Sequence, residues 1–102
     1  MKDIFTIRRR LQEGLFEFSR HAFRRAIERN ISEQEIRSAG ALAEIIEEYP
    51  GDKYSPSALL LGFTSNGRPL HFQVSLDEAD MVKIITIYEP GEGSWIEFRK
   101  RR

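Results

Sequence analysis

The apolar pattern of this 102-residue chain changes from a helical period to a strand-type period near its middle, and this change limits the fold most strongly. Before residue 44, apolar side chains recur every three or four residues, as on one face of a helix. From residue 44 onward, short apolar runs alternate with loops that are rich in Pro, Gly, Asp and Ser. Helices followed by strands are typical of an α+β fold. We therefore expect two to three N-terminal helices on one face of a mainly antiparallel, four- to five-stranded sheet.

Residues 1–102 are expected to form a single domain, because the chain has the usual length of one hydrophobic core and contains no repeat or flexible linker. The absence of cysteine excludes disulfides, thiolate metal sites and a cysteine nucleophile. Three consecutive arginines interrupt the N-terminal region where a secretion signal needs an apolar run, and no apolar stretch approaches the roughly 18 residues of a spanning helix. These features predict a cytoplasmic protein that does not associate with membranes.

The net charge is zero, but the charges are distributed unevenly along the chain. Residues 1–30 contain eight basic and four acidic side chains, whereas residues 31–60 contain two basic and six acidic ones. Four further basic residues lie in a C-terminal tail, residues 97–102. The two basic regions have the charge needed to attract an anion, although a solvated helix face and a frayed tail would carry the same pattern.

The clearest helix signal is the capping box formed by Ser32 and Glu35, and Ser19 is a good N-cap for the preceding helix. In that preceding helix, Phe23, Ala26 and Ile27 are predicted to form the buried face. The predicted helices cover residues 4–11, 20–29 and 33 to about 41, and the predicted strands cover residues 15–18, 44–49, 58–64, 69–75 and 82–88.

The pair Asn66-Gly67 is the best hairpin signal, because a two-residue type I′ turn needs positive φ at both central positions. A turn of this type places Ser65 opposite Arg68 and Gly62 opposite His71. The core face of the hairpin then carries Leu59, Leu61, Phe63, Leu70, Phe72 and Val74. The other face is mixed, and we expect it to be covered by the segment around Trp95, by a second copy or by a partner.

The helix over residues 20–29 carries the first candidate functional residues. His21 lies in its first turn, where the positive end of the helix dipole favours the neutral imidazole that a general base needs. Arg25 follows one turn later with Arg24 and Arg29 beside it, and arginine binds phosphate through charge-assisted hydrogen bonds. A surface histidine among arginines that merely solvate the helix would give the same spacing. The pattern therefore fits both a catalytic phosphate site and an ordinary solvated helix surface.

His71 is the second candidate, because the predicted register leaves a small depression above Gly62 beside its side chain. If His21 and His71 shared one site, they would act as base and acid in cleaving RNA through attack of the 2′-hydroxyl, with arginine stabilising the phosphorane. Tyr88 would supply a further hydroxyl group. The alternative is that His71 is half-buried in the core and that Tyr88 serves packing.

Other kinds of site find no support in the sequence. It contains no Gly-rich phosphate loop, and its two histidines and scattered carboxylates have no metal-binding spacing, so we expect neither a cofactor nor a metal. A helix-turn-helix interpretation is weak, because its second helix would open with Glu33, Gln34 and Glu35, whose charges repel phosphate. We therefore expect no sequence-specific DNA binding.

Three short segments combine into a more specific pattern. They are Phe18-Ser19-Arg20-His21-Ala22, followed by Arg25, Arg29 and Ile31-Ser32; Gly67-Arg68-Pro69-Leu70-His71; and Ile85-Thr86-Ile87-Tyr88-Glu89-Pro90, followed by Trp95. The pattern resembles the small prokaryotic domain-of-unknown-function family 4258 over about residues 15–96. The resemblance implies a fold similar to RelE-type and BrnT-type toxins, which are metal-independent ribonucleases usually neutralised by an antitoxin. It also implies that His21, Arg25, Arg29 and His71 are the family's characteristic residues.

Two functions from different classes are therefore predicted. The first is a metal-independent endoribonuclease of toxin type, which acts on RNA or on the ribosome and has an antitoxin as its partner. The second is a non-catalytic binding or assembly module, which uses the second face of the sheet in a homodimer or as the neutralising member of a pair. The neutral charge departs from a typical ribonuclease, since a basic surface helps to bind phosphates.

Overall fold

The computed structural model describes residues 1–102 and shows the predicted α+β fold. Its helices are α1 (Ile4–Gln12), α2 (Arg20–Glu28) and α3 (Glu33–Gly40). The main sheet contains β1 (Phe16–Phe18), β2 (Glu44–Tyr49), β3 (Ser57–Phe63), β4 (Pro69–Ser75) and β5 (Val82–Tyr88). A short C-terminal hairpin consists of β6 (Trp95–Ile96) and β7 (Lys100–Arg101).

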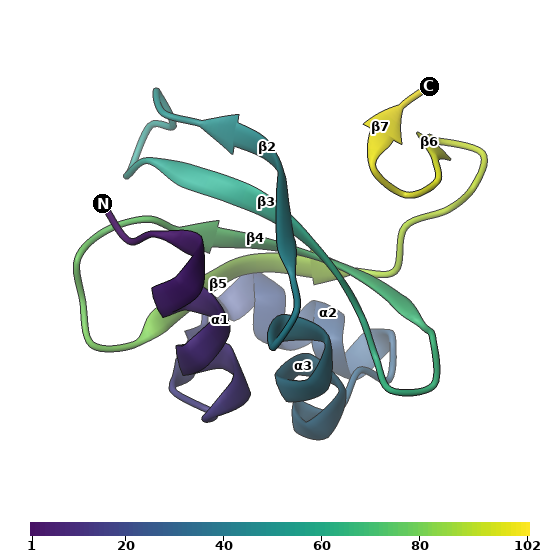
Figure 1. The fold of residues 1–102 in the computed structure, drawn as a ribbon, viewed down its shortest axis with the longest axis horizontal. Coiled ribbons are helices and arrows are strands. Elements are labelled where there is room, and N and C mark those ends of the chain that lie inside the picture. The colour runs from purple at the N-terminus through teal and green to yellow at the C-terminus, as the bar shows by residue number, and fades with distance from the viewer.

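The main sheet has the strand order β1-β5-β4-β3-β2, in which β1 is parallel to β5 and the other pairs are antiparallel. The three helices lie on one side of this sheet, and the C-terminal hairpin lies on the other side (Figure 1). We call these sides the helix face and the second face. Because the chain passes from β1 directly into α2, the α2 N-terminus lies at the β1–β5 edge of the sheet.

Side-chain caps explain where the helices begin. The side chains of Asp3 and Ser19 accept hydrogen bonds from backbone N–H groups in the first turns of α1 and α2. At α3, Ser32 and Glu35 form both hydrogen bonds of the predicted capping box. Each cap satisfies N–H groups that have no partner within the helix, so these three starting points are encoded locally.

The buried face of α2 differs from the predicted one. Ala22 and Ala26 are buried against the sheet, whereas Phe23 and Ile27 are 56% and 65% exposed. The backbone N–H of Ser19 donates to the carbonyl oxygen of Ile84, which fixes the helix start against β5. From that start, the two alanines face the sheet, and their small side chains allow the close approach. The prediction that Phe23 and Ile27 belong to the core is therefore wrong.

The register of the β3–β4 hairpin is shifted by one residue from the predicted one. Thr64 pairs with Arg68 around a three-residue loop, in which only Gly67 has a positive φ, of 83°. The N–H of Gly67 donates to the carbonyl oxygen of Thr64, as in a type I turn followed by a left-handed residue. His71 therefore lies opposite Leu61, and Gly62 lies opposite Leu70.

This shift exchanges the predicted faces of β3. Ala58, Leu60 and Gly62 lie on the helix face, and a Cβ atom on Gly62 would overlap the carbonyl oxygen of Ala39 in α3. Gly62 thus permits close packing of α3 and does not lie beside His71, which is on the second face. The predicted depression above Gly62 is absent for this reason.

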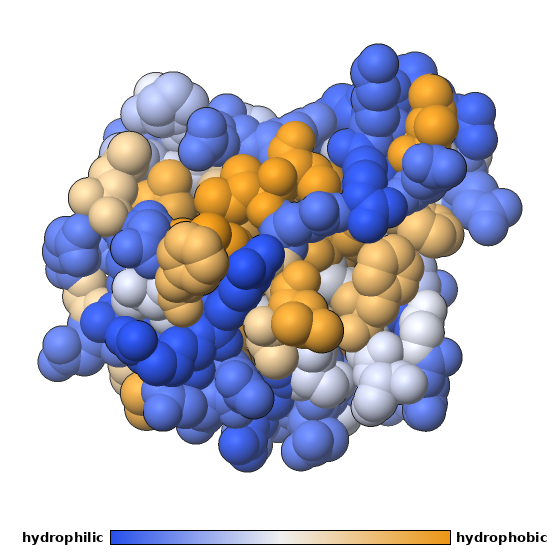
Figure 2. Space-filling view, in the orientation of Figure 1, coloured by the Kyte–Doolittle hydropathy of each residue, from blue (hydrophilic) through white to orange (hydrophobic).

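The predicted basic tail is part of the C-terminal hairpin, which covers one end of the second face. Trp95 is only 4% exposed, and Phe98 packs against Phe63 with ring centroids 6.3 Å apart. Ion pairs join Arg99 to Glu44 at 2.5 Å and Arg101 to Glu47 at 2.9 Å. The outer surface of this hairpin is mostly hydrophilic (Figure 2). The sequence predicts that the second face is covered by the segment around Trp95, by a second copy or by a partner. The structure shows that the segment around Trp95 covers part of it.

Candidate functional site

The outward surface of α2 combines His21 with an excess of positive charge. His21 is exposed in the first turn of α2. Arg20 and Arg24 in the helix and Arg29 at its C-cap are exposed as well. These three arginines form no ion pair, whereas Arg25 lies 3.5 Å from Glu28. The outward surface of α2 and its C-cap therefore keeps three guanidinium groups free to contact anions.

The N-terminal end of α2 is held firmly on the sheet by Ser19. Its hydroxyl group donates to the carbonyl oxygen of Ile85 at 2.7 Å and accepts from the N–H of Ala22 at 3.0 Å. Because Ser19 belongs to both the sheet edge and the helix cap, the position of His21, two residues later, is fixed relative to β5.

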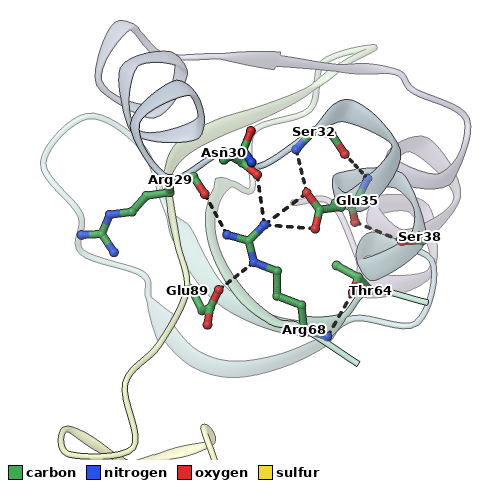
Figure 3. Close-up of polar contacts among 8 residues, drawn as sticks. All are labelled: Arg29, Asn30, Ser32, Glu35, Ser38, Thr64, Arg68 and Glu89. Carbon is green, nitrogen blue, oxygen red and sulfur yellow. Dashed lines mark hydrogen bonds and ion pairs between the residues drawn. The ribbon is translucent and has the colours of Figure 1, made fainter. Parts of the chain in front are cut away.

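The C-terminal end of α2 is held by Arg68, whose guanidinium group lies at the centre of a polar network (Figure 3). It donates to the backbone carbonyl oxygens of Arg29 at 2.8 Å and Asn30 at 3.1 Å. It also contacts the carboxylates of Glu35 at 3.0 Å and Glu89 at 2.6 Å. The Arg29 side chain points away from this network in Figure 3, so its guanidinium group stays available at the surface. The sequence marked Arg68 only as part of a family pattern, with no signal for this role.

His71 and Tyr88 form a second polar group, enclosed beneath the C-terminal hairpin. His71 is fully buried, and its Nε2 atom donates to the carbonyl oxygen of Phe98 at 2.7 Å. Its Nδ1 atom therefore accepts from the Tyr88 hydroxyl group, at 3.0 Å, and the ring packs edge-on against Trp95. Burial lowers the pKa of His71 and raises that of Tyr88, so both groups are neutral at pH 7.

The structure does not bring the two histidines together. His21 lies on α2, which packs against the helix face, whereas His71 points from β4 to the second face. Tyr88 accompanies His71, and the candidate arginines Arg24, Arg25 and Arg29 accompany His21. A single phosphate cannot contact both histidines in this arrangement, because the sheet separates them.

A polar groove that the sequence did not predict runs along the second face beside the C-terminal hairpin. One part has a volume of about 520 Å³ and extends from Ser19 and Lys83 to Asp52 and Gln73. An adjoining part shares Asp52 and Gln73 and extends to Arg101. Because Ser19 caps α2, the groove begins beside the first turn of the helix that carries His21.

Charged and aromatic groups line the hairpin end of this groove. Arg101 forms two hydrogen bonds with Glu47, at 2.9 and 3.1 Å, and lies 4.7 Å above the ring of Trp95. The Tyr49 hydroxyl group donates to the same carboxylate. The hydrogen bonds from Arg101 lower the pKa of Glu47, and burial together with Glu47 raises the pKa of Tyr49. Glu47 is therefore ionised and Tyr49 is neutral at pH 7.

The sequence profile of a family described as a domain of unknown function, DUF4258, matches residues 18–89, which is more than half of the chain. The chain belongs to the DUF4258 family. The DUF4258 segment contains His21, Arg68, His71 and Tyr88 but ends before the C-terminal hairpin. No curated protein and no solved structure matches the chain significantly, so the similarity to RelE-type and BrnT-type toxins stays a prediction.

Two further observations concern the chemistry open to this DUF4258 protein. None of its helices has the length and hydrophobicity that are needed to cross a bilayer. No three His, Asp or Glu side chains lie close enough together to bind a metal ion. The groups available near α2 are therefore an imidazole, several guanidinium groups and the polar side chains of the groove.

Proposed function

We propose that this DUF4258 protein is a metal-independent endoribonuclease that acts in the cytoplasm and binds RNA across the N-terminal end of α2. The observation that carries this proposal is the position of exposed His21, which follows the groove-lining residue Ser19 by two residues at the sheet edge and shares α2 and its caps with three unpaired arginines. A strand of RNA in the groove would lead its phosphates to this basic surface.

In the proposed reaction, His21 acts as a general base. Its imidazole removes the proton from a ribose 2′-hydroxyl group, and the oxygen attacks the adjacent phosphorus atom. The bond from phosphorus to the 5′-oxygen breaks, and this oxygen takes a proton from solvent. The products are a 2′,3′-cyclic phosphate and a 5′-hydroxyl end. Arg24 and Arg25, which follow His21 by about one turn, are the candidates for stabilising the negative charge on phosphorus in the transition state. Arg29 lies at the other end of α2 and would bind a neighbouring phosphate of the strand.

His71 and Tyr88 have a different part in this proposal. With both ring nitrogens of His71 engaged and its side chain fully buried, we assign the pair to holding the C-terminal hairpin against the sheet. This assignment replaces the two-histidine mechanism with one that needs only His21 at the phosphate.

The proposal is tested by incubating RNA with the purified protein in excess chelator, with and without ribosomes. We expect cleavage by the wild type and by Arg9→Ala, which removes an exposed, unpaired arginine from α1. We expect no cleavage by His21→Ala, and about 10-fold lower kcat/KM for Arg24→Ala or Arg29→Ala. Circular dichroism confirms that each variant is folded. Full activity of His21→Ala would contradict the proposed role of α2.

A second candidate function, a non-catalytic binding module, is favoured by the exposed apolar pair Phe23 and Ile27, one turn apart on α2. This pair would contact a protein partner such as an antitoxin, or a second copy. Sedimentation at several concentrations tests the second copy. A mass that doubles in the wild type but stays monomeric in Phe23→Glu would support assembly through α2, and a constant monomeric mass would exclude a homodimer.

A further inference from the structure

The middle of the groove on the second face presents two hydrogen-bond acceptors without a partner. Asp52 accepts at Oδ2 from the Ser57 hydroxyl group at 2.7 Å and from Nε2 of Gln73 at 3.3 Å. No group in the protein donates to Oδ1 of Asp52 or to Oε1 of Gln73. Both residues are only partly buried, and no enclosed polar atom lacks a partner, so these two oxygens are open to the groove.

The two acceptors are also held in place. Ser57 is fully buried and links the two side chains, because it accepts from Gln73 at 3.2 Å and donates to Asp52. Both side chains are therefore positioned before any ligand arrives. Because Nε2 of Gln73 contacts Oδ2 of Asp52 at 3.3 Å, the two free oxygens belong to groups that touch each other. Such a pair of acceptors favours a ligand with two neighbouring N–H donors, since a ligand with fewer donors leaves an acceptor desolvated and unpaired.

The charges along the groove indicate where the parts of a bound RNA strand would lie: a base in the middle and phosphates on either side. Asp52 and Asp77 both line the groove, and their negative charges repel phosphate from its middle part. Lys83 lines the groove on one side of the Asp52–Gln73 pair, and Arg101 lines it on the other side. The flat rings of Tyr49 and Tyr54 also line the groove, and aromatic rings are surfaces on which nucleobases stack.

Among the four RNA bases, guanine alone has two adjacent donors, N1–H and the N2 amino group, on its Watson–Crick edge. Adenine and cytosine present one amino group beside a ring-nitrogen acceptor, and uracil presents one N–H between two carbonyl groups. We propose that the Asp52–Gln73 pair is a specificity site for a guanine base of the bound RNA strand. This inference rests on the proposed function and assigns it a substrate class: single-stranded RNA that contains guanine.

The test compares the binding of fluorescent RNA octamers by anisotropy at one fixed salt concentration. The octamers are all uridine, or uridine with one central guanine or one central adenine. We expect the guanine octamer to bind about 10-fold more tightly than the other two, which is typical of a paired hydrogen-bond contact to a base. Equal affinities for the three RNAs would overturn the proposal.

Two matched variants distinguish a direct contact between Asp52 and guanine from a general effect of negative charge on RNA binding. Asp52→Asn keeps acceptors for Ser57 and Gln73 but replaces the free acceptor with an amide donor, so it should abolish the guanine preference. Asp80→Asn removes the same charge from an exposed loop outside the groove and should keep the preference. Urea unfolding confirms that both variants are folded. Equal loss of the preference in both variants would contradict a specific contact at Asp52.

Two further results would separate this inference from the proposed function. RNA cleavage without any preference for guanine would overturn the guanine site and support the nuclease. A preference for guanine that depends on Asp52, without cleavage by any protein, would support the site and contradict the nuclease. The last probe is guanosine 5′-monophosphate, whose affinity is compared with that of the guanine octamer. Equally tight binding would show that the groove binds a free nucleotide, and this result would overturn the assignment to RNA.

Discussion

Replacement of Arg68 by alanine tests how the C-terminal end of α2 is held. The change removes hydrogen bonds to the carbonyl oxygens of Arg29 and Asn30 and ion pairs with Glu35 and Glu89. A hydrogen bond from a charged donor stabilises by about 1.5 kcal/mol, and a partly exposed ion pair by about 0.5 kcal/mol. Since the Arg68 side chain is 25% exposed, we expect the free energy of unfolding to fall by about 2 to 4 kcal/mol.

Urea and thermal unfolding followed by circular dichroism provide the measurement. For a domain of this size, 1 kcal/mol corresponds to about 4 to 8 °C, so a loss of about 2 to 4 kcal/mol should lower the melting temperature of Arg68→Ala by roughly 8 to 32 °C. Arg68→Lys should lose about 1 to 2 kcal/mol, because lysine keeps the charge but lacks the planar fork that reaches four partners. Arg9→Ala, the unpaired control, should stay within about 0.5 kcal/mol of the wild type. If Arg68→Ala were equally stable, or if lysine restored full stability, the network would not hold α2 as described.

Two other predictions concern stability. Gly62→Ala should cost about 2 to 3 kcal/mol in urea unfolding because its methyl group would overlap α3, whereas Gly93→Ala, with open space around it, should change little. Burial lowers the pKa of His71, so below about pH 6.5 the unfolded chain binds a proton that the folded chain does not. The free energy of unfolding should therefore fall as the pH drops from 7 to 5, by up to about 1.4 kcal/mol per pH unit. Urea unfolding across this range checks the slope, which His21→Gln should retain and His71→Gln should reduce; a slope unchanged in His71→Gln would refute this cause.

The parts of the fold that the sequence predicted correctly are those encoded by short-range contacts. Ser32 and Glu35 exchange two hydrogen bonds within one helical turn, so they fix the start of α3 without help from the rest of the chain. The predicted pairing of β3 with β4 is wrong by one residue, because the sequence Asn66-Gly67 fits both a two-residue and a three-residue loop. Only the packing of α3 against Gly62 distinguishes the two loops, and that contact is tertiary.

The candidate site was predictable to a smaller extent. His21 follows a recognisable cap, and its exposed position on α2 agrees with the helical pattern. The burial of His71 depends on the C-terminal hairpin, whose turn places Glu97 and Phe98 at positive φ values of 52° and 62°. Neither residue type signals such a turn, since glycine and asparagine are usual there. The groove was unpredictable because its walls come from strands β4 and β5, the loop after β2, the C-terminal hairpin and the α2 cap, which are far apart in the sequence.

The parallel pairing of β1 with β5 sets the order in which this chain can fold. Phe16 pairs with Val82, so the first strand has no neighbour until the last strand of the sheet has been made. During synthesis, α1 and α2 leave the ribosome before the surface against which they pack, whereas β2, β3 and β4 are joined by short connections and can pair at once. We therefore expect the antiparallel strands to associate first, with β1 and its two flanking helices docking as the final, slowest step.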